Sequence, residues 1–179
     1  MTDQLAADGG LVLRQWRESD AAAVLLAFSA PEMSRQATRA VEDQADATRW
    51  VQDRLRDWNA GTGFSWAVLD HRAEVVGCAA VTAVDHRHGS GWVSYWTTAE
   101  ARGLGVASAG TLAVARWAFA DLGLFRLELG HRTNNPASCR VARRAGFLVE
   151  GLERAKLSYD GVRYDVELHA RLATDPEPG

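Results

Sequence analysis

The sequence contains no apolar run that approaches the roughly 20 residues needed to cross a bilayer. It has only two cysteines: Cys78 lies in an apolar run and Cys139 among arginines, which gives neither a disulfide framework nor a zinc spacing. Lysine is scarce as well, because Lys156 is the only one; arginine is plentiful, but the formal net charge is still −3. We therefore expect no membrane contact, two reduced thiols and no nucleic-acid partner, which would need a clustered basic face.

The start of the chain lacks the features of a secretory signal, since Met1–Gly10 is acidic and has neither a basic beginning nor an apolar stretch. We expect a cytoplasmic protein. A length of 179 residues suits one domain that buries its core without disulfides or metals. The prediction is a single domain over residues 1–179, with a folded core at residues 11–172 and frayed segments at residues 1–10 and 173–179.

Periodicity and turn residues divide the chain into strands and helices. Short stretches rich in β-branched and aromatic residues predict strands at Leu11–Trp16, Ser65–Leu69, Val75–Val84, Gly91–Thr97, Phe125–Gly130, Leu148–Leu157 and Val162–Leu172. Helical spacing with stop signals predicts helices at Asp20–Phe28, Asp43–Trp58, Gly105–Leu122 and Asn135–Gly146. Ser19 is the expected N-cap of the first helix.

The order of these elements predicts a mixed α/β (α+β) fold. Three strands between Ser65 and Thr97 follow one another as an antiparallel meander, and the last two form a hairpin around Tyr159-Asp160-Gly161. The helix Gly105–Leu122 connects two strands as one parallel crossover. The central sheet is therefore expected to be mostly antiparallel, with flanking helices.

A glycine-rich turn, Arg102-Gly103-Leu104-Gly105-Val106-Ala107, lies directly before the long helix. Unpaired backbone N–H groups and the helix dipole at such a turn suit a pyrophosphate, which glycines allow to approach closely. Two alternatives stay open. The turn serves chain reversal alone, or it binds a dinucleotide, because Gly103-Leu104-Gly105 with Ser108 loosely resembles a Rossmann fingerprint. The single crossover disfavours the dinucleotide, whose fold is built from several such units.

A second motif runs from Asn135-Pro136-Ala137-Ser138 to Arg144-Ala145-Gly146-Phe147. An N-cap, a first-turn proline and a glycine stop account for this motif by themselves. Its arginines Arg140, Arg143 and Arg144 are typical of a solvated helix end. The pairing of this motif with the glycine-rich turn, in this order and with a helix and a strand between them, resembles the GNAT acetyltransferases.

Within that superfamily the chain is similar to the branch of the ribosomal-protein N-terminal (Rim-type) acetyltransferases. The similarity covers nearly all of Leu11–Leu172 and rests on Leu11–Arg14 with Ser19-Asp20, the Tyr95-Trp96 pair, Ser138–Phe147 and the closing hairpin to Asp165. The resemblance implies transfer of an acetyl group from acetyl-CoA to a primary amine. The acceptor would be a protein N-terminus, an amino acid, or an amine-bearing metabolite or antibiotic, and a homodimer stays open.

The resemblance also implies where acetyl-CoA binds. The pantetheine arm would pair with the strand at Trp92–Thr97 where it splays from Phe125–Gly130, and the glycine-rich turn would hold the pyrophosphate. The implied cofactor contacts are Tyr95, Trp96, Thr97, Arg102, Gly103, Leu104, Gly105, Val106, Ala107, Ser108, Asn135 and Ser138. A backbone N–H near Tyr95–Thr97 would hold the thioester oxygen, Asn135 would fix the pantetheine or a water, and Ser138 would protonate the leaving thiolate. The alternative for Ser138 is a hydrogen bond within its helical turn.

This sequence lacks the general bases of the family pattern, because it has Trp92 and Lys156-Leu157 at the positions where relatives carry carboxylates. Glu128 remains a catalytic candidate, matched by a glutamate in some relatives, and Asp165 lies on the last strand. Alternatively, Glu128 pairs with a nearby arginine and Asp165 braces the hairpin. We expect no single strong base, with any contribution from Glu128 passing through water.

No metal is expected, because His86 and His88 share a turn without a third ligand nearby. A catalytically weak acyl-CoA-binding sensor or regulatory domain is the alternative function.

Acceptor specificity is expected to come from Ser29–Gln44, the Asp85–Ser90 loop and the final hairpin, none of which carries a recognisable code. Trp50, Trp58 and Trp92 are candidates for an aromatic acceptor pocket, although helical spacing favours core packing for the first two.

Overall fold

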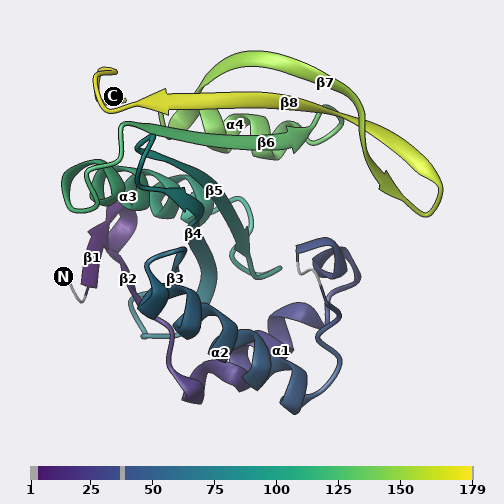
Figure 1. Ribbon diagram of the computed structural model, residues 1–179. Helices are drawn as coiled ribbons and strands as arrows, with labels where there is room; N and C mark the ends of the chain where they lie inside the picture. The colour runs from purple at the N-terminus through teal and green to yellow at the C-terminus, as the bar shows by residue number, and fades with distance from the viewer. Residues whose placement is uncertain (1–3, 37–38, 179) are drawn as a thin grey trace.

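The computed structural model describes residues 4–36 and 39–178, and within them eight strands form one sheet, in the spatial order β1-β2-β3-β4-β5-β6-β8-β7 (Figure 1). The strands are β1 (Gln4–Ala7), β2 (Leu11–Gln15), β3 (Phe64–Leu69), β4 (Val75–Asp85), β5 (Ser90–Thr97), β6 (Arg126–Arg132), β7 (Leu148–Tyr159) and β8 (Val162–Leu172). The helices are α1 (Ala21–Phe28), α2 (Gln44–Ala60), α3 (Val106–Ala120) and α4 (Pro136–Arg144), with 3₁₀ turns η1 (Asp8–Gly10), η2 (Glu18–Asp20) and η3 (Pro31–Gln36).

The sheet is mostly antiparallel, as the sequence predicts. Every neighbouring pair is antiparallel except β5 and β6, which α3 connects as a parallel crossover. The last two strands form a long hairpin, and β8 lies between β6 and β7. The mixed α/β fold class is therefore confirmed. No helix in the described part of the chain is long and apolar enough to span a membrane.

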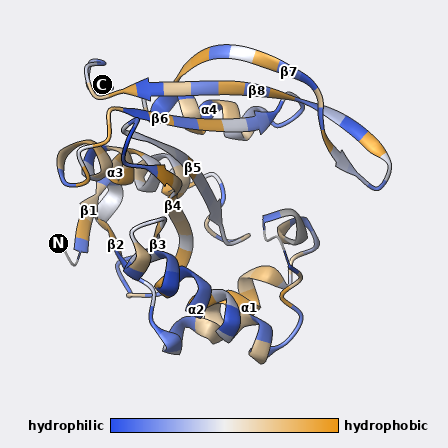
Figure 2. Ribbon diagram, in the orientation of Figure 1, coloured by the Kyte–Doolittle hydropathy of each residue, from blue (hydrophilic) through white to orange (hydrophobic). Residues whose placement is uncertain are grey.

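Helices cover both faces of the sheet, α1 and α2 on one face and α3 and α4 on the other (Figure 1). Because both faces are covered, strand β3 has apolar residues on both of its sides. Trp66 and Val68 belong to the core next to α3, whereas Ala67 and Leu69 belong to the core beneath α1 and α2. Because both faces are covered, all of β3 is buried and its sequence shows no polar alternation. In Figure 2, α1 is coloured mostly hydrophobic, whereas much of α2 is hydrophilic.

Tryptophans fill both cores. Trp16, Trp50 and Trp96 pack against one another under α1 and α2, and Trp50 and Trp96 also pack against Phe28, with ring centroids 5.0–6.2 Å apart. Trp58 packs instead on the other cluster. Both helix tryptophans that were candidates for an acceptor pocket thus contact core residues, as their spacing favours.

The segments for which the sequence predicts fraying lie partly outside the described residues, at 1–3 and 179, and their described parts contact the rest of the fold. Gln4–Ala7 pairs with β2 and covers an edge that would otherwise expose unpaired backbone groups. In the tail, the carboxylate of Glu177 accepts hydrogen bonds from Arg116 and from Arg171, which is 1% exposed. A buried guanidinium needs such a partner, and this requirement holds the tail against the sheet.

Ser19 is not the N-cap that the sequence predicts. It lies inside η2, and α1 begins at Ala21 without a side-chain cap. Asp20 occupies the N-cap position of α1, but its side chain binds other partners. Its carboxylate accepts hydrogen bonds from the guanidinium of Arg14 at 2.7 and 2.8 Å and from the backbone N–H of Arg17 at 2.8 Å. Burial alone would raise the pKa of Asp20, but the hydrogen bonds from Arg14 and Arg17 outweigh it and hold this pKa below its usual range.

Replacement Asp20→Asn should lower the free energy of unfolding by about 3 kcal/mol at pH 7, because it leaves the guanidinium of Arg14, only 12% exposed, beside a neutral partner. Since the carboxylate titrates lower in the folded state, its stabilisation is complete above the unfolded pKa of about 4 and is lost as the pH falls through the folded pKa. Urea unfolding between pH 2.5 and 7 measures this.

The matched control is Asp53→Asn, which removes an exposed partner of Arg56 on α2 and should cost less than about 0.5 kcal/mol. A wild-type advantage over Asp20→Asn that stays constant down to the lowest pH would contradict the ion pair as its source.

Candidate active site

The strands β5 and β6 separate in the middle of the sheet. They pair only at Ser90–Trp92 and Arg126–Glu128, while β5 stays paired with β4 through Thr97 and β6 stays paired with β8 through Arg132. Beyond Trp92, every second N–H and C=O group of β5 therefore faces the gap between the strands without a strand partner. This splay, which the family resemblance implies, gives β5 an open edge inside the sheet.

The glycine-rich turn and α3 follow directly at the end of that edge. Gly105 is the N-cap of α3 in a left-handed conformation with φ of 84°, and no side chain caps the first turn. The first N–H groups of a helix have no partner within it, and the helix dipole adds positive potential there. An ideal Cβ built on Gly105 meets no protein atom within 4 Å, so the space in front of this turn is open.

A cavity of about 290 Å³ lies between the start of α3 and one face of α4. From the predicted cofactor set, its lining includes Thr97, Gly103, Gly105, Val106, Ala107 and Ser108. The opposite wall is Ala137, Arg140, Val141 and Arg144 of α4. Among the described residues that line the cavity none is acidic, and the two guanidiniums and the helix start give it a charge that suits an anion.

Arg140 and Arg144 are functional candidates that the sequence argument assigned to a solvated face. Both side chains border the cavity because they lie four residues apart, on the same side of α4 as Ala137 and Val141. The missed signal was this spacing in the helix that follows the glycine-rich crossover. Arg143, by contrast, does not line this cavity.

Three of the predicted cofactor side chains point elsewhere. Trp96 lies in the core beneath α1 and α2 and is 7% exposed. The guanidinium of Arg102 pairs with the carboxylate of Glu32 in η3, and neither Arg102 nor Leu104 lines the cavity between α3 and α4. None of these three residues lines the cavity between α3 and α4.

Helix α4 begins with the cap that the sequence predicts. The side-chain oxygen of Asn135 accepts a hydrogen bond from the backbone N–H of Ser138 at 3.2 Å, and Pro136 occupies the first turn. The hydroxyl of Tyr95 on β5 donates to the backbone carbonyl of Ser138 at 3.2 Å. Burial raises the pKa of Tyr95, so the phenol stays protonated as a donor. Two hydrogen bonds thus fix half-buried Ser138 opposite the open edge of β5.

The carboxylate of Glu128 lies at the point where the strands diverge, since Glu128 and Trp92 are the last residue pair between β5 and β6. It is held in an ion pair with Arg126 at 2.6 Å, as its alternative interpretation proposes. Hydrogen bonds to Glu150 and Glu128 raise the pKa of Arg126, which keeps this guanidinium charged. The carboxylate of Glu128 is therefore engaged by a neighbouring guanidinium.

Asp165 also follows its structural interpretation. Its carboxylate accepts a hydrogen bond from the backbone N–H of Ala155 at 2.7 Å, and its backbone carbonyl accepts one from Thr133. It therefore braces the bulge in the β7–β8 hairpin.

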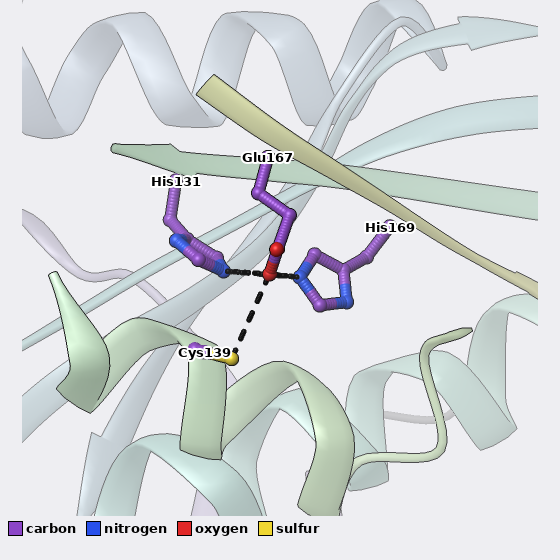
Figure 3. Close-up of side chains that lie close together, drawn as sticks. All are labelled: His131, Cys139, Glu167 and His169. Atoms are coloured by element: carbon purple, nitrogen blue, oxygen red, sulfur yellow. Dashed lines mark hydrogen bonds and ion pairs between the residues drawn. The ribbon is translucent and has the colours of Figure 1, made fainter. Parts of the chain in front are cut away.

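Four potential metal ligands outside the predicted set lie together behind α4. His131 of β6, Cys139 of α4, and Glu167 and His169 of β8 converge in Figure 3, and their ligand atoms lie within 4.8 Å of one another. The pattern missed this group because it depends on the pairing of β6 with β8. The two histidines that were considered, His86 and His88, lie on the exposed β4–β5 turn, where His86 contacts the carbonyl of Gly61.

The family model of the acetyltransferase (GNAT) domain matches residues 10–148, and the chain therefore belongs to the GNAT acetyltransferases. It is 27% identical over 162 residues to the uncharacterized N-acetyltransferase YoaA of Bacillus subtilis, covering 89% of this chain and 92% of that protein.

Two solved structures share the fold over most of the chain. RimJ of Mycobacterium smegmatis, in complex with a CoA disulfide, has a TM-score of 0.84 and 24% identity, covering 95% of this chain and 86% of that one. RimL, a ribosomal α-N-protein acetyltransferase in complex with coenzyme A as a CoA–cysteine disulfide, has a TM-score of 0.85 and 23% identity, covering 94% of this chain and 97% of that one. These likenesses bear out the fold, and the family model bears out the resemblance to the GNAT acetyltransferases.

Proposed function

We propose that this N-acetyltransferase moves the acetyl group of acetyl-CoA onto an α-amino group, by direct attack of the amine on the thioester. The observation that carries the proposal is the open edge of β5 beside an anion cavity, with Ser138 held across from that edge. RimL, which shares the fold, is described as an α-N-protein acetyltransferase bound to coenzyme A. A protein N-terminus, an amino acid and a small amine all present a suitable primary amine.

The two halves of the cofactor suit two parts of the site. The backbone N–H groups from Gly103 to Ser108, with Arg140 and Arg144 opposite, supply the donors and positive charge that a pyrophosphate needs. The amide-containing pantetheine arm suits the unpaired backbone groups of β5 beyond Trp92, as an added strand would. Its thioester end then lies toward Tyr95 and Ser138.

The chemistry needs a neutral amine, a held oxyanion and a protonated leaving group. As the amine nitrogen bonds to the carbonyl carbon, the oxygen gains charge that a free N–H of β5 stabilises. The C–S bond then breaks, and the hydroxyl of Ser138 gives its proton to the departing thiolate and regains one that water relays from the attacking amine. The excess proton on the amine leaves through water, with Glu128 contributing only indirectly because Arg126 holds it.

The lack of a strong base favours an α-amine as the acceptor. Such an amine has an unperturbed pKa of about 7.7–8.0, so a usable fraction is neutral near pH 7, whereas a lysine-type amine has a pKa of about 10.4. The position of Trp92, where relatives carry a carboxylate, is consistent with this modest demand. Its half-buried ring packs over Gly130 and cannot accept a proton.

Gly105→Val should weaken CoA binding at least about tenfold, because the new side chain fills the space in front of the helix start where the pyrophosphate is proposed to lie. Gly123→Val is the matched control. Gly123 also has a positive φ, of 67°, and open space around its Cβ, but it does not line the cavity. Isothermal titration of both folded variants compares the dissociation constants, and equal values would remove the cavity as the cofactor site.

Ser138→Ala should lower kcat and kcat/KM for acetyl-CoA together by about a hundredfold or more, since proton donation acts only in the transition state. Glu128→Gln should cost less than about tenfold. Thiol release from acetyl-CoA measures both. A loss confined to the KM for acetyl-CoA would make Ser138 a binding residue, and a collapse of kcat in Glu128→Gln would make Glu128 the base.

The acceptor class is tested by pH–rate profiles with a peptide bearing a free α-amine and with a polyamine. If the substrate supplies its own neutral amine, the acidic limb of kcat/KM should follow the pKa of whichever amine is offered, and the α-amine should be faster at pH 7. An acidic limb at one fixed pH for both acceptors would show that a group of the enzyme controls deprotonation. Thiol release without any acceptor is subtracted as the background.

A further inference from the structure

The group formed by His131, Cys139, Glu167 and His169 lies in the interior behind α4 and has no part in the proposed reaction. The two histidine side chains are 5% and 0% exposed, and Glu167 is 28% exposed. His131 and Glu167 are directly paired between β6 and β8, and His169 follows two residues further on the same face of β8. The side chain of Cys139 on α4 lies next to these residues (Figure 3).

In both imidazoles, the hydrogen bond made by Nδ1 determines whether Nε2 carries a proton. Nδ1 of His131 lies 3.0 Å from the carbonyl oxygen of Arg132, and Nδ1 of His169 lies 3.4 Å from that of Phe147. A carbonyl only accepts, so each Nδ1 carries the proton. In the neutral imidazoles each Nε2 then holds a lone pair. A carbonyl-bound Nδ1 with a free Nε2 is the usual state of a metal-ligating histidine.

These lone pairs face one another and an acceptor. The two Nε2 atoms are 3.0 Å apart, and Oε1 of Glu167 lies 2.9 Å from Nε2 of His169 and 3.4 Å from Nε2 of His131. The sulfur of Cys139 lies 3.6 Å from the same oxygen. The two Nε2 lone pairs and the carboxylate of Glu167 repel one another in this buried space unless a positive charge lies between them. That charge is supplied either by extra protons on the imidazoles or by a cation.

We propose that this group binds one divalent transition-metal ion of the zinc type, with His131, Cys139, Glu167 and His169 as its four protein ligands. Tetrahedral zinc with bonds of about 2.0–2.3 Å to N, O and S places its ligand atoms about 3.3–3.8 Å apart. The four separations given above are 2.9–3.6 Å and all ligand atoms lie within 4.8 Å of one another, so small side-chain shifts bring them to these values. Imidazole, thiolate and carboxylate together suit Zn²⁺ or Co²⁺ rather than Mg²⁺ or Ca²⁺. Four protein ligands leave no open position, which indicates a structural ion rather than a catalytic one.

The ion would tie α4 to the sheet directly behind Ser138. Cys139 is the ligand from α4, and the other three come from β6 and β8, so binding joins the helix that carries Ser138 to the strands that form one side of the gap. This role is separate from acetyl transfer, and it can hold or fail independently of the proposed function.

Cobalt titration of tag-free, chelator-treated protein tests the proposal. The wild type should bind one equivalent of Co²⁺ and show the visible bands of a tetrahedral site with a thiolate-to-cobalt charge-transfer band, which zinc displaces. Cys139→Ser should lose the charge-transfer band and bind at least about tenfold more weakly. His86→Gln, which removes an exposed histidine of the β4–β5 turn, should match the wild type.

Thermal unfolding gives a second readout. Zinc at about 100 times its dissociation constant should raise the Tm of the wild type by about 5–10 °C and leave that of His169→Gln unchanged. If His169→Gln does not fold, the folded Cys139→Ser protein decides. A wild type that binds neither cobalt nor zinc, or a Cys139→Ser spectrum identical to that of the wild type, would overturn the site and leave shared protons as what joins these side chains.

Discussion

The separation of β5 from β6 is the constraint on which the rest of the structure depends. Their ladder has three residue pairs, after which each strand keeps only its outer neighbour, β4 or β8. Unpaired backbone groups inside a sheet cost free energy unless another partner pairs with them. The fold therefore leaves room for an extended, strand-like ligand between β5 and β6. The start of α3 at Gly105 lies at one end of this space and adds positive potential there. An extended arm with a charged end meets both requirements at once.

Side chains keep the two strands apart. A Cβ at Gly130 would lie 3.1 Å from the indole of Trp92 and 2.9 Å from Val166, so the absent side chain makes room for the ring in the angle between the strands. Further along, the hydrogen bond from Tyr95 to Ser138 spans from β5 to α4.

Local signals in the sequence predicted most of the fold and the outline of the site. Glycine, proline and cap residues mark chain reversals whatever the rest of the protein does, which is why the turn before α3 and the Asn135 cap follow from the sequence. Long-range pairing leaves no such mark. Three features depend on which distant segments become neighbours: the pairing of β1, the ion pair of Arg171 with Glu177, and the contact of His131 with Glu167. A single sequence does not reveal strand register, so none of them could be predicted.

Helix α4 shows how a short element gathers several roles. Successive residues of a helix point about 100° apart, so neighbours in sequence reach different surroundings. The carbonyl of Ser138 meets β5, the sulfur of Cys139 meets β8, and the guanidinium of Arg140 borders the cavity beside α3. Any movement of α4 therefore changes the anion site and the position of Ser138 together. Because one face of the helix is packed on β6 and β8, the stability of that buried contact sets how firmly both parts of the site are held.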